Sequence, residues 1–124
     1  MIPRLAKQQR NDGLLLRLAL AYAQTKDSRL DATVQALRAR FNAARERGDS
    51  VHRREEARFA LMLLNRPKTA LQLAQANWAV QKEPADALIL LQAARAAKQE
   101  DAAQSVRDFI AKAGWSDQRL NGLL

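Results

Sequence analysis

The single histidine of the chain, His52, stands four residues before Glu56 in the stretch HRREE. On a helix this spacing brings an imidazole and a carboxylate to one face, as in many zinc sites. A zinc site needs at least three protein ligands, and the chain has no second histidine and no cysteine. We therefore predict no metal site here. The expected role of this stretch is an exposed, charged first helical turn, with Glu55 and Glu56 near the positive end of the helix dipole.

Other arrangements that support catalysis are missing from the sequence. A cysteine nucleophile is excluded, and a serine nucleophile would have only His52 as its base. No glycine-rich loop joins a strand to a helix, so the sequence offers no phosphate cradle. The adjacent acids Glu100 and Asp101 are expected to lie in a turn and cap a helix. The sequence therefore predicts a protein that is not an enzyme and needs no cofactor.

The charge of the chain is +8 and is unevenly distributed. Residues 1–58 carry 13 basic and 7 acidic side chains, whereas residues 59–124 carry 8 and 6. An anionic partner should prefer the first half. A basic stripe can neutralise the phosphates of a nucleic acid, but few aromatic side chains are present to stack on bases. The candidate basic patch comprises Arg38, Arg45, Arg47 and Arg58. Its simplest interpretation is a solvated helix face. A surface that binds a protein partner comes second, and a surface that binds nucleic acid comes third.

Helix-forming residues dominate the elements that must position these side chains. Only four glycines and three prolines occur, and no stretch alternates apolar and polar residues as a half-buried strand would. The sequence therefore predicts an all-α fold. Apolar residues recur at helical spacing in seven segments. These are 13–26, 29–47, a third beginning at Asp49 or Ser50, 67–82, 87–98, 101–113 and 116–123.

Polar and turn-forming residues mark the expected helix ends. Asn11 or Asp12 should cap the first helix, Asp86 the fifth and Ser116 the last. Gly48 and Gly114 are expected to end helices in the left-handed conformation. Pro67 is well placed in the first turn of the fourth helix, and Pro84 should stop that helix. The inward face of the first helix is expected to hold Leu14, Leu15, Leu18, Ala21 and Tyr22.

Two parts of the chain match each other at an offset of 34 residues. Ala60 then falls on Ala94, and Ala79 falls on Ala113. This interval, with Pro84 five residues after Ala79, resembles the tetratricopeptide repeat. The segment AVQKEPADA is similar to the ALELDPNNA closure of that family. The resemblance implies antiparallel helical hairpins stacked as a short right-handed superhelix of about six or seven helices.

The resemblance also implies how the chain is divided. Hairpins are expected at about 13–48, 50–83 and 87–113, followed by a closing helix at about 116–123, in a single domain. The first hairpin lacks both the interval and the proline and is degenerate. Trp78 and Trp115 are expected to pack between neighbouring hairpins. The chain resembles the C-terminal part of longer bacterial proteins of this family.

In the tetratricopeptide family, the first helix of each hairpin lines a concave groove. The lysine and asparagines of its chaperone-tail variety are missing, because Ala57 and Leu61 stand there. Leucines mixed with cations suit an acidic or amphipathic segment. The resemblance thus implies a protein-interaction or scaffold module, and the alternative is a basic, helical nucleic-acid-binding protein. The groove residues carried over are Arg54, Leu61, Asn65, Leu91, Arg95, Lys98 and Gln99.

The sequence also bears on where the protein acts. Its longest apolar runs fall far short of the ~20 residues that a membrane span needs, and the stretch MIPRLAKQQR lacks the apolar region of a signal peptide. We expect a soluble protein with no membrane partner, cytoplasmic if the chain is complete and periplasmic if it is a fragment. The oligomeric state is left open.

Overall fold

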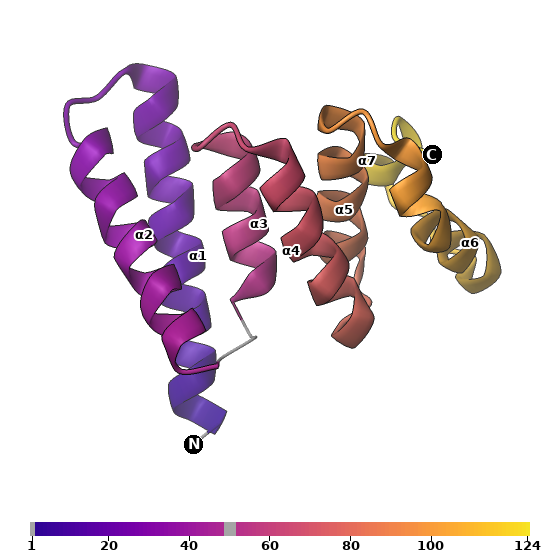
Figure 1. The fold of residues 1–124 in the computed structure, drawn as a ribbon, viewed down its shortest axis with the longest axis horizontal. Helices are drawn as coiled ribbons and strands as arrows, with labels where there is room; N and C mark the ends of the chain where they lie inside the picture. The colour runs from indigo at the N-terminus through magenta and orange to yellow at the C-terminus, as the bar shows by residue number, and fades with distance from the viewer. Residues whose placement is uncertain (1, 49–51) are drawn as a thin grey trace.

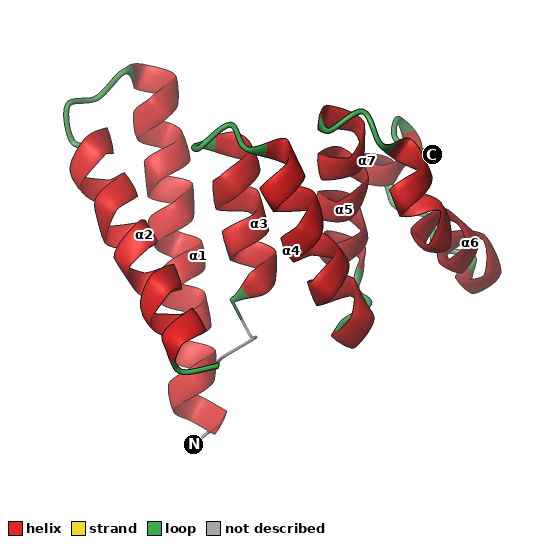
Figure 2. Cartoon of the chain, viewed as in Figure 1, coloured by secondary structure: helices red, strands yellow, loops and turns green. Residues whose placement is uncertain are grey.

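The computed structural model describes the backbone of residues 2–48 and 52–124, and the side chains of residues 12–48 and 52–124. No strand occurs within these ranges, so the all-α prediction is confirmed (Figure 2). Seven α-helices and one 3₁₀ helix follow in order: α1 Ile2–Thr25, α2 Leu30–Glu46, α3 Arg53–Met62, α4 Pro67–Val80, α5 Pro84–Ala96, η1 Glu100–Ala103, α6 Gln104–Ala113 and α7 Gln118–Asn121.

The helices form antiparallel hairpins that stand in a row (Figure 1). The α1–α2 hairpin lies at one end, α3–α4 follows, and α5 with η1 and α6 lies at the other end. The first helices of successive hairpins contact one another, because α3 touches both α1 and α5. This arrangement is that of a helical repeat. None of the helices in the described part of the chain is both long enough and apolar enough to cross a membrane.

The local signals for helix ends are largely confirmed. Helix α2 covers Leu30–Glu46, against a prediction of 29–47, and Gly48 and Gly114 both adopt the left-handed conformation, with φ of 70° and 67°. Pro67 occupies the first turn of α4, as expected. Asp49 and Ser50, the predicted start of the third helix, lie outside the described residues. Helix α4 ends at Val80, two residues early, and the predicted sixth helix is divided into η1 and α6.

The prediction that Asp86 caps the fifth helix is wrong, and this helix begins before residue 87, its predicted start. Pro84 begins α5 and does not merely stop α4, because proline fixes a helical φ and lacks only an N–H that a first turn leaves unpaired. Glu83 is the N-cap, and Asp86 is the third residue of the helix. The two residues form a capping box: the Glu83 side chain accepts the backbone N–H of Asp86, and the Asp86 side chain accepts the backbone N–H of Glu83. Likewise, Asp117 caps α7 where Ser116 was predicted to do so.

The predictions for the first helix are also wrong. Helix α1 begins at Ile2, so Asp12 lies inside it and is not a cap. Its inward face is turned from the predicted one: Leu16 and Ala19 are fully buried, whereas Leu14 and Leu18 are 57% and 43% exposed. The three consecutive leucines at 14–16 fit either face by periodicity alone. Packing against α2 and α3 selects the face that carries Leu16.

The apolar core consists of two clusters. The larger cluster spans α3 to α7 and includes the buried alanines Ala60 and Ala94, which the repeat pattern placed inward. Ala79 and Ala113, also placed inward by that pattern, are exposed, whereas Trp78 and Ile110 of the same helical turns are buried in the core. The smaller cluster joins α1 and α2 to α3 through five buried residues: Leu16, Ala19, Leu37, Phe41 and Phe59.

Aromatic side chains join the hairpins within the larger cluster. Trp78 of α4 lies edge-on to Phe109 of α6, with 5.2 Å between ring centroids, and Trp115 lies 6.5 Å from Trp78. Phe109 and Trp115 are 5.2 Å apart. The prediction that both tryptophans pack between hairpins is confirmed.

Candidate functional site

A groove of about 470 Å³ lies between the first helices of two successive hairpins. We call it the α3–α5 groove. Its walls come from α3 and α5, and Arg119 of α7 closes one side. Residues four apart on a helix share a face, and the α3 side chains follow this spacing. The lining residues are Arg54, Glu55, Arg58, Met62, Ala85, Leu88, Ile89, Gln92 and Arg119.

The α3–α5 groove combines an apolar surface with a cationic rim. Met62 is 41% exposed, and Leu88 of α5 is half-buried. Buried Glu55 accepts from Arg58 Nη1 at 3.2 Å and lies 3.5 Å from Arg54 Nε. Arg119 pairs with Asp117 at 2.9 Å, outside the groove lining. Each guanidinium has five N–H donors, so these pairs leave donors for a further carboxylate.

Asp86 holds Arg54 in position from beneath the rim. Its carboxylate is fully buried, and its Oδ1 lies 3.4 Å from Arg54 Nη1. The same oxygen accepts a 2.7 Å hydrogen bond from Asn77 Nδ2, and Oδ2 accepts the Glu83 N–H at 2.9 Å. The first turn of α5 is thereby tied to α3 and α4. This network fixes one cation of the groove on a rigid support.

Few of the predicted groove residues line the α3–α5 groove. Of the seven predicted groove residues, Arg54 alone is in its lining. Leu91 is buried in the core and Leu61 packs partly against it, so neither lines the groove. The actual groove face on α5 is turned by about one residue from the face carried over from the family pattern, to Leu88, Ile89 and Gln92.

The remaining predicted groove residues lie at helix ends. Asn65 and Lys98 adopt the left-handed conformation in the turns after α3 and α5, with φ of 53° and 58°, and Gln99 precedes η1. Arg95 binds Glu100 Oε1 at 3.1 Å and the Gly122 carbonyl at 3.0 Å. Their prediction as groove residues placed the ends of the third and fifth helices later in the chain than Met62 and Ala96, where α3 and α5 end. The contribution of Arg119 was missed because α7 returns to α5 through tertiary packing, which no local pattern records.

The four arginines of the predicted basic patch do not form one surface. Arg45 of α2 pairs with Glu56 at 2.9 Å, on the side of α3 that faces α2. Arg58 lines the α3–α5 groove and pairs with Glu55. Arg38 and Arg45 both line one further pocket beside α2, and Arg47 lines another. A single phosphate-binding stripe is therefore not formed.

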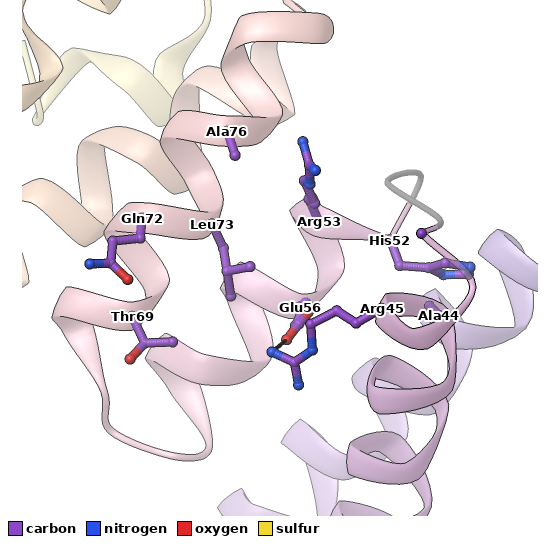
Figure 3. A pocket seen from close by; sticks show the side chains of 10 residues that line it. Ala44, Arg45, His52, Arg53, Glu56, Thr69, Gln72, Leu73 and Ala76 are labelled. Carbon is purple, nitrogen blue, oxygen red and sulfur yellow. Dashed lines mark ion pairs between the residues drawn. The ribbon is translucent and has the colours of Figure 1, made fainter.

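A second hollow, of about 390 Å³, lies between α2 and α4 above α3 (Figure 3). We call it the α2–α4 cleft. The Arg45 guanidinium reaches across it to Glu56, and Leu73 of α4 points into it (Figure 3). His52 also lines the cleft, but its imidazole Nδ1 lies 2.5 Å from Asp12 Oδ2 of α1. Arg40 binds the other oxygen of Asp12 at 3.0 Å.

The prediction of an exposed first turn in the HRREE stretch is therefore wrong. His52, Glu55 and Glu56 are 4%, 8% and 7% exposed. Helix α1 extends further than predicted and brings Asp12 to His52, while α2 brings Arg45 to Glu56. Charged residues can be buried when partners from other helices neutralise them. Within the described ranges, no group of three His, Cys, Asp or Glu side chains could hold a metal ion.

Burial raises the pKa of the Glu56 carboxyl, although Arg45 and His52 act against this shift. At pH values between the ordinary pKa of Glu56 and its raised pKa in the folded protein, the folded state binds more protons than the unfolded state. The ionisation of Glu56 therefore lowers the stability of the fold as the pH rises. Replacing Glu56 by glutamine is therefore expected to raise the melting temperature at about pH 7, with a gain that shrinks toward about pH 4. Thermal melts followed by circular dichroism would measure both.

The matched control for this prediction is Glu46→Gln, which neutralises an exposed carboxylate at the end of α2. Its effect on the melting temperature should vary less with pH, since an exposed carboxylate keeps its hydration in the folded state. A Glu56→Gln variant that is less stable than wild type at all pH values would show that the Arg45 ion pair outweighs desolvation.

In comparisons with known proteins, no family model, curated protein or solved structure matches the chain.

Proposed function

We propose that this chain is a non-enzymatic, tetratricopeptide-like interaction module whose α3–α5 groove binds a short acidic, amphipathic segment of a partner protein. The observation that carries the proposal is the groove itself: exposed Met62 and half-buried Leu88 lie among three arginines. An amphipathic segment would bury its apolar side chains against the first two. Its carboxylates would be held by charge-assisted hydrogen bonds from the guanidinium groups.

The placement of the groove supports the same proposal. It lies between the first helices of successive hairpins, which is where the resemblance to tetratricopeptide repeats puts a ligand. Glu55 is the one acidic residue in its lining, and its pairing with Arg54 and Arg58 keeps both cations at the groove. The nucleic-acid alternative has weaker support, because Arg47 and Arg58 line pockets other than the one that Arg38 and Arg45 share.

A peptide-display selection against the full immobilised chain tests this proposal. Selected peptides should combine acidic with apolar residues. Arg58→Glu with Arg119→Glu should weaken their binding at least about tenfold, because two attractive contacts become repulsive. Both arginines are partly exposed, so the double variant should fold.

The matched control carries the same change of charge away from the groove. Arg17→Glu with Lys68→Glu replaces exposed cations of α1 and α4 and should leave peptide affinity within about twofold of wild type, since exposed charges beyond a Debye length are screened. Peptides without acidic residues, or equal losses in the two double variants, would contradict the proposal. Fluorescence anisotropy with a labelled selected peptide would give the affinities.

A further inference from the structure

A small pocket opens beside the α2–α4 cleft and shares three lining residues with it, Arg45, Glu56 and Thr69, which Figure 3 shows. We call it the arginine pocket. Its volume is about 190 Å³, and α2, α3, the turn after α3 and the start of α4 all contribute to it. The lining residues are Arg38, Phe41, Asn42, Arg45, Glu56, Phe59, Ala60, Leu64, Arg66 and Thr69.

Two of the three arginines in this pocket have no side-chain partner among the residues that the structure describes. The Nε atom of Arg38 is buried and has no hydrogen-bond acceptor within the described part of the chain. Arg66 likewise makes no side-chain hydrogen bond or ion pair with any described residue. Only Arg45 is neutralised, by Glu56 at 2.9 Å. Buried N–H donors are normally paired, and Arg38, whose Nε lacks an acceptor, is one of the residues that line the pocket.

The start of α4 adds to this excess of positive charge. Arg66 is the N-cap residue, its side chain caps nothing, and the first turn of this 14-residue helix has no acidic residue. The free N–H groups of a first turn carry a partial positive charge that favours an anion. Thr69, the third residue of α4, lines the pocket and has a hydroxyl that can donate. Cations, helix end and hydroxyl therefore meet at one hollow.

The apolar part of the lining limits the chemistry of the ligand further. Phe41 and Phe59, whose ring centroids lie 5.4 Å apart, line the pocket together with Leu64. A volume of about 190 Å³ equals about six water molecules, enough for one phosphoryl group and the first atoms of an apolar group bonded to it. Three guanidinium groups against one carboxylate leave an excess of two positive charges. That excess matches a phosphate monoester, which carries about −1.5 to −2 at neutral pH.

We propose that the arginine pocket binds a phosphate monoester of a small apolar alcohol or phenol. Arg38 and Arg66 bind the phosphoryl oxygens, Thr69 donates to them, and the apolar group contacts Phe41 and Leu64. No bond is made or broken. Glu56 opposes binding by its charge, while its pair with Arg45 holds that guanidinium at the pocket.

Calorimetric titration of the full chain with phenyl phosphate tests the proposal. Saturable binding is expected, and Arg38→Met and Arg66→Met should each weaken it about tenfold, the loss of one charge-assisted contact. Arg66 is exposed and makes no side-chain pair within the described residues, so its removal should leave the fold intact. Arg17→Met, at an exposed position of α1, is the matched control and should bind phenyl phosphate as wild type does.

Two further probes test the phosphoryl group and the apolar group of the ligand separately. Inorganic phosphate should bind more weakly than phenyl phosphate, and benzyl alcohol should not bind measurably. Equal affinities for the two phosphates would overturn the apolar contact, and unchanged affinity in both arginine variants would overturn the site. Glu56→Gln should tighten phenyl phosphate binding, because it removes the opposing charge. Amide NMR shifts should change at Lys68 and Thr69, which start α4, and not at α6.

The result of the phenyl phosphate titration does not depend on whether the α3–α5 groove binds a peptide. Arg58 and Arg119 lie at the α3–α5 groove and do not line the arginine pocket. The Arg58→Glu/Arg119→Glu variant should therefore retain phenyl phosphate binding, and Arg66→Met should retain peptide binding.

Discussion

Replacing Asp86 by alanine is expected to lower the free energy of unfolding by about 3–5 kcal/mol, because it removes one partner of a buried charged network. Asp86 is 0% exposed and accepts from Asn77 Nδ2 at 2.7 Å and from the Glu83 N–H at 2.9 Å. Its loss leaves the buried Asn77 amide without this acceptor and removes half of the capping box of α5. Arg54 also loses its fully buried anion.

Urea unfolding followed by far-UV circular dichroism would measure this loss. Asp86→Asn keeps an acceptor for Asn77 but not the charge, so it should fall between alanine and wild type. Asp108→Ala is the control: this exposed carboxylate of α6 accepts a hydrogen bond from Gln104 Nε2 at 3.0 Å, and its removal should cost no more than about 0.5 kcal/mol. Similar losses at Asp86 and Asp108 would show that the capping network contributes little to stability.

Replacing Trp78 by alanine is expected to cost about 3–5 kcal/mol as well, through the cavity left by a large buried side chain. Trp78 is 6% exposed and lies edge-on to Phe109 and Trp115. It is the one member of this aromatic group that is buried, whereas the other two are half-buried. Its removal should loosen α6 more than the rest of the chain, because these aromatic contacts join α4 to α6 and to the segment after it.

Hydrogen exchange would locate this loosening. Amides of α6 in Trp78→Ala should exchange faster, while those of α2, which takes no part in the aromatic group, should keep their protection relative to the global stability. Trp115→Phe is the matched control: it keeps an aromatic ring at the edge of the group and should cost about 1 kcal/mol. Unchanged exchange in α6 would mean that η1 and α7 suffice to hold it.

The elements that sequence reasoning predicted well have signals close to them in the chain. Helix α2 shows uninterrupted periodicity from Leu30 to Ala44 and a glycine, Gly48, where a left-handed residue is needed. The end of α6 at Gly114 has the same local cause. Such features need no knowledge of the neighbouring helices, because they depend on backbone conformation and on one apolar face.

The features that were predicted wrongly depend on distant partners. Nothing local to His52 shows that Asp12, forty residues earlier, would bury it. The three leucines at 14–16 could face either way until α2 and α3 selected one face. Pro84 is compatible with ending one helix and with starting the next, and the capping box with Asp86 decided between them. In each case a tertiary contact overrode a valid local signal.

The types of residue that line the proposed groove were predicted better than their positions in the sequence. Arginines beside leucines were expected, and the α3–α5 groove does place Arg54 near Leu88. The turn of about one residue on α5 moved Leu91 into the core and brought Gln92 to the groove. The face that a short helix presents is set by packing on both sides, and a repeat pattern with degenerate units defines that face only approximately.

Helix α3, only ten residues long, is shared between the two apolar clusters. Phe59 belongs to the cluster of α1 and α2, whereas Ala57 and Ala60 belong to the cluster that continues to α7. In a linear array, folding cooperativity is transmitted from unit to unit only through such interfaces. The coupling between the first hairpin and the rest therefore depends on Phe59 and on the Asp12–His52 and Arg45–Glu56 pairs. We therefore expect opening of the first hairpin to require breaking only these contacts, none of which involves α5 or α7 of the α3–α5 groove.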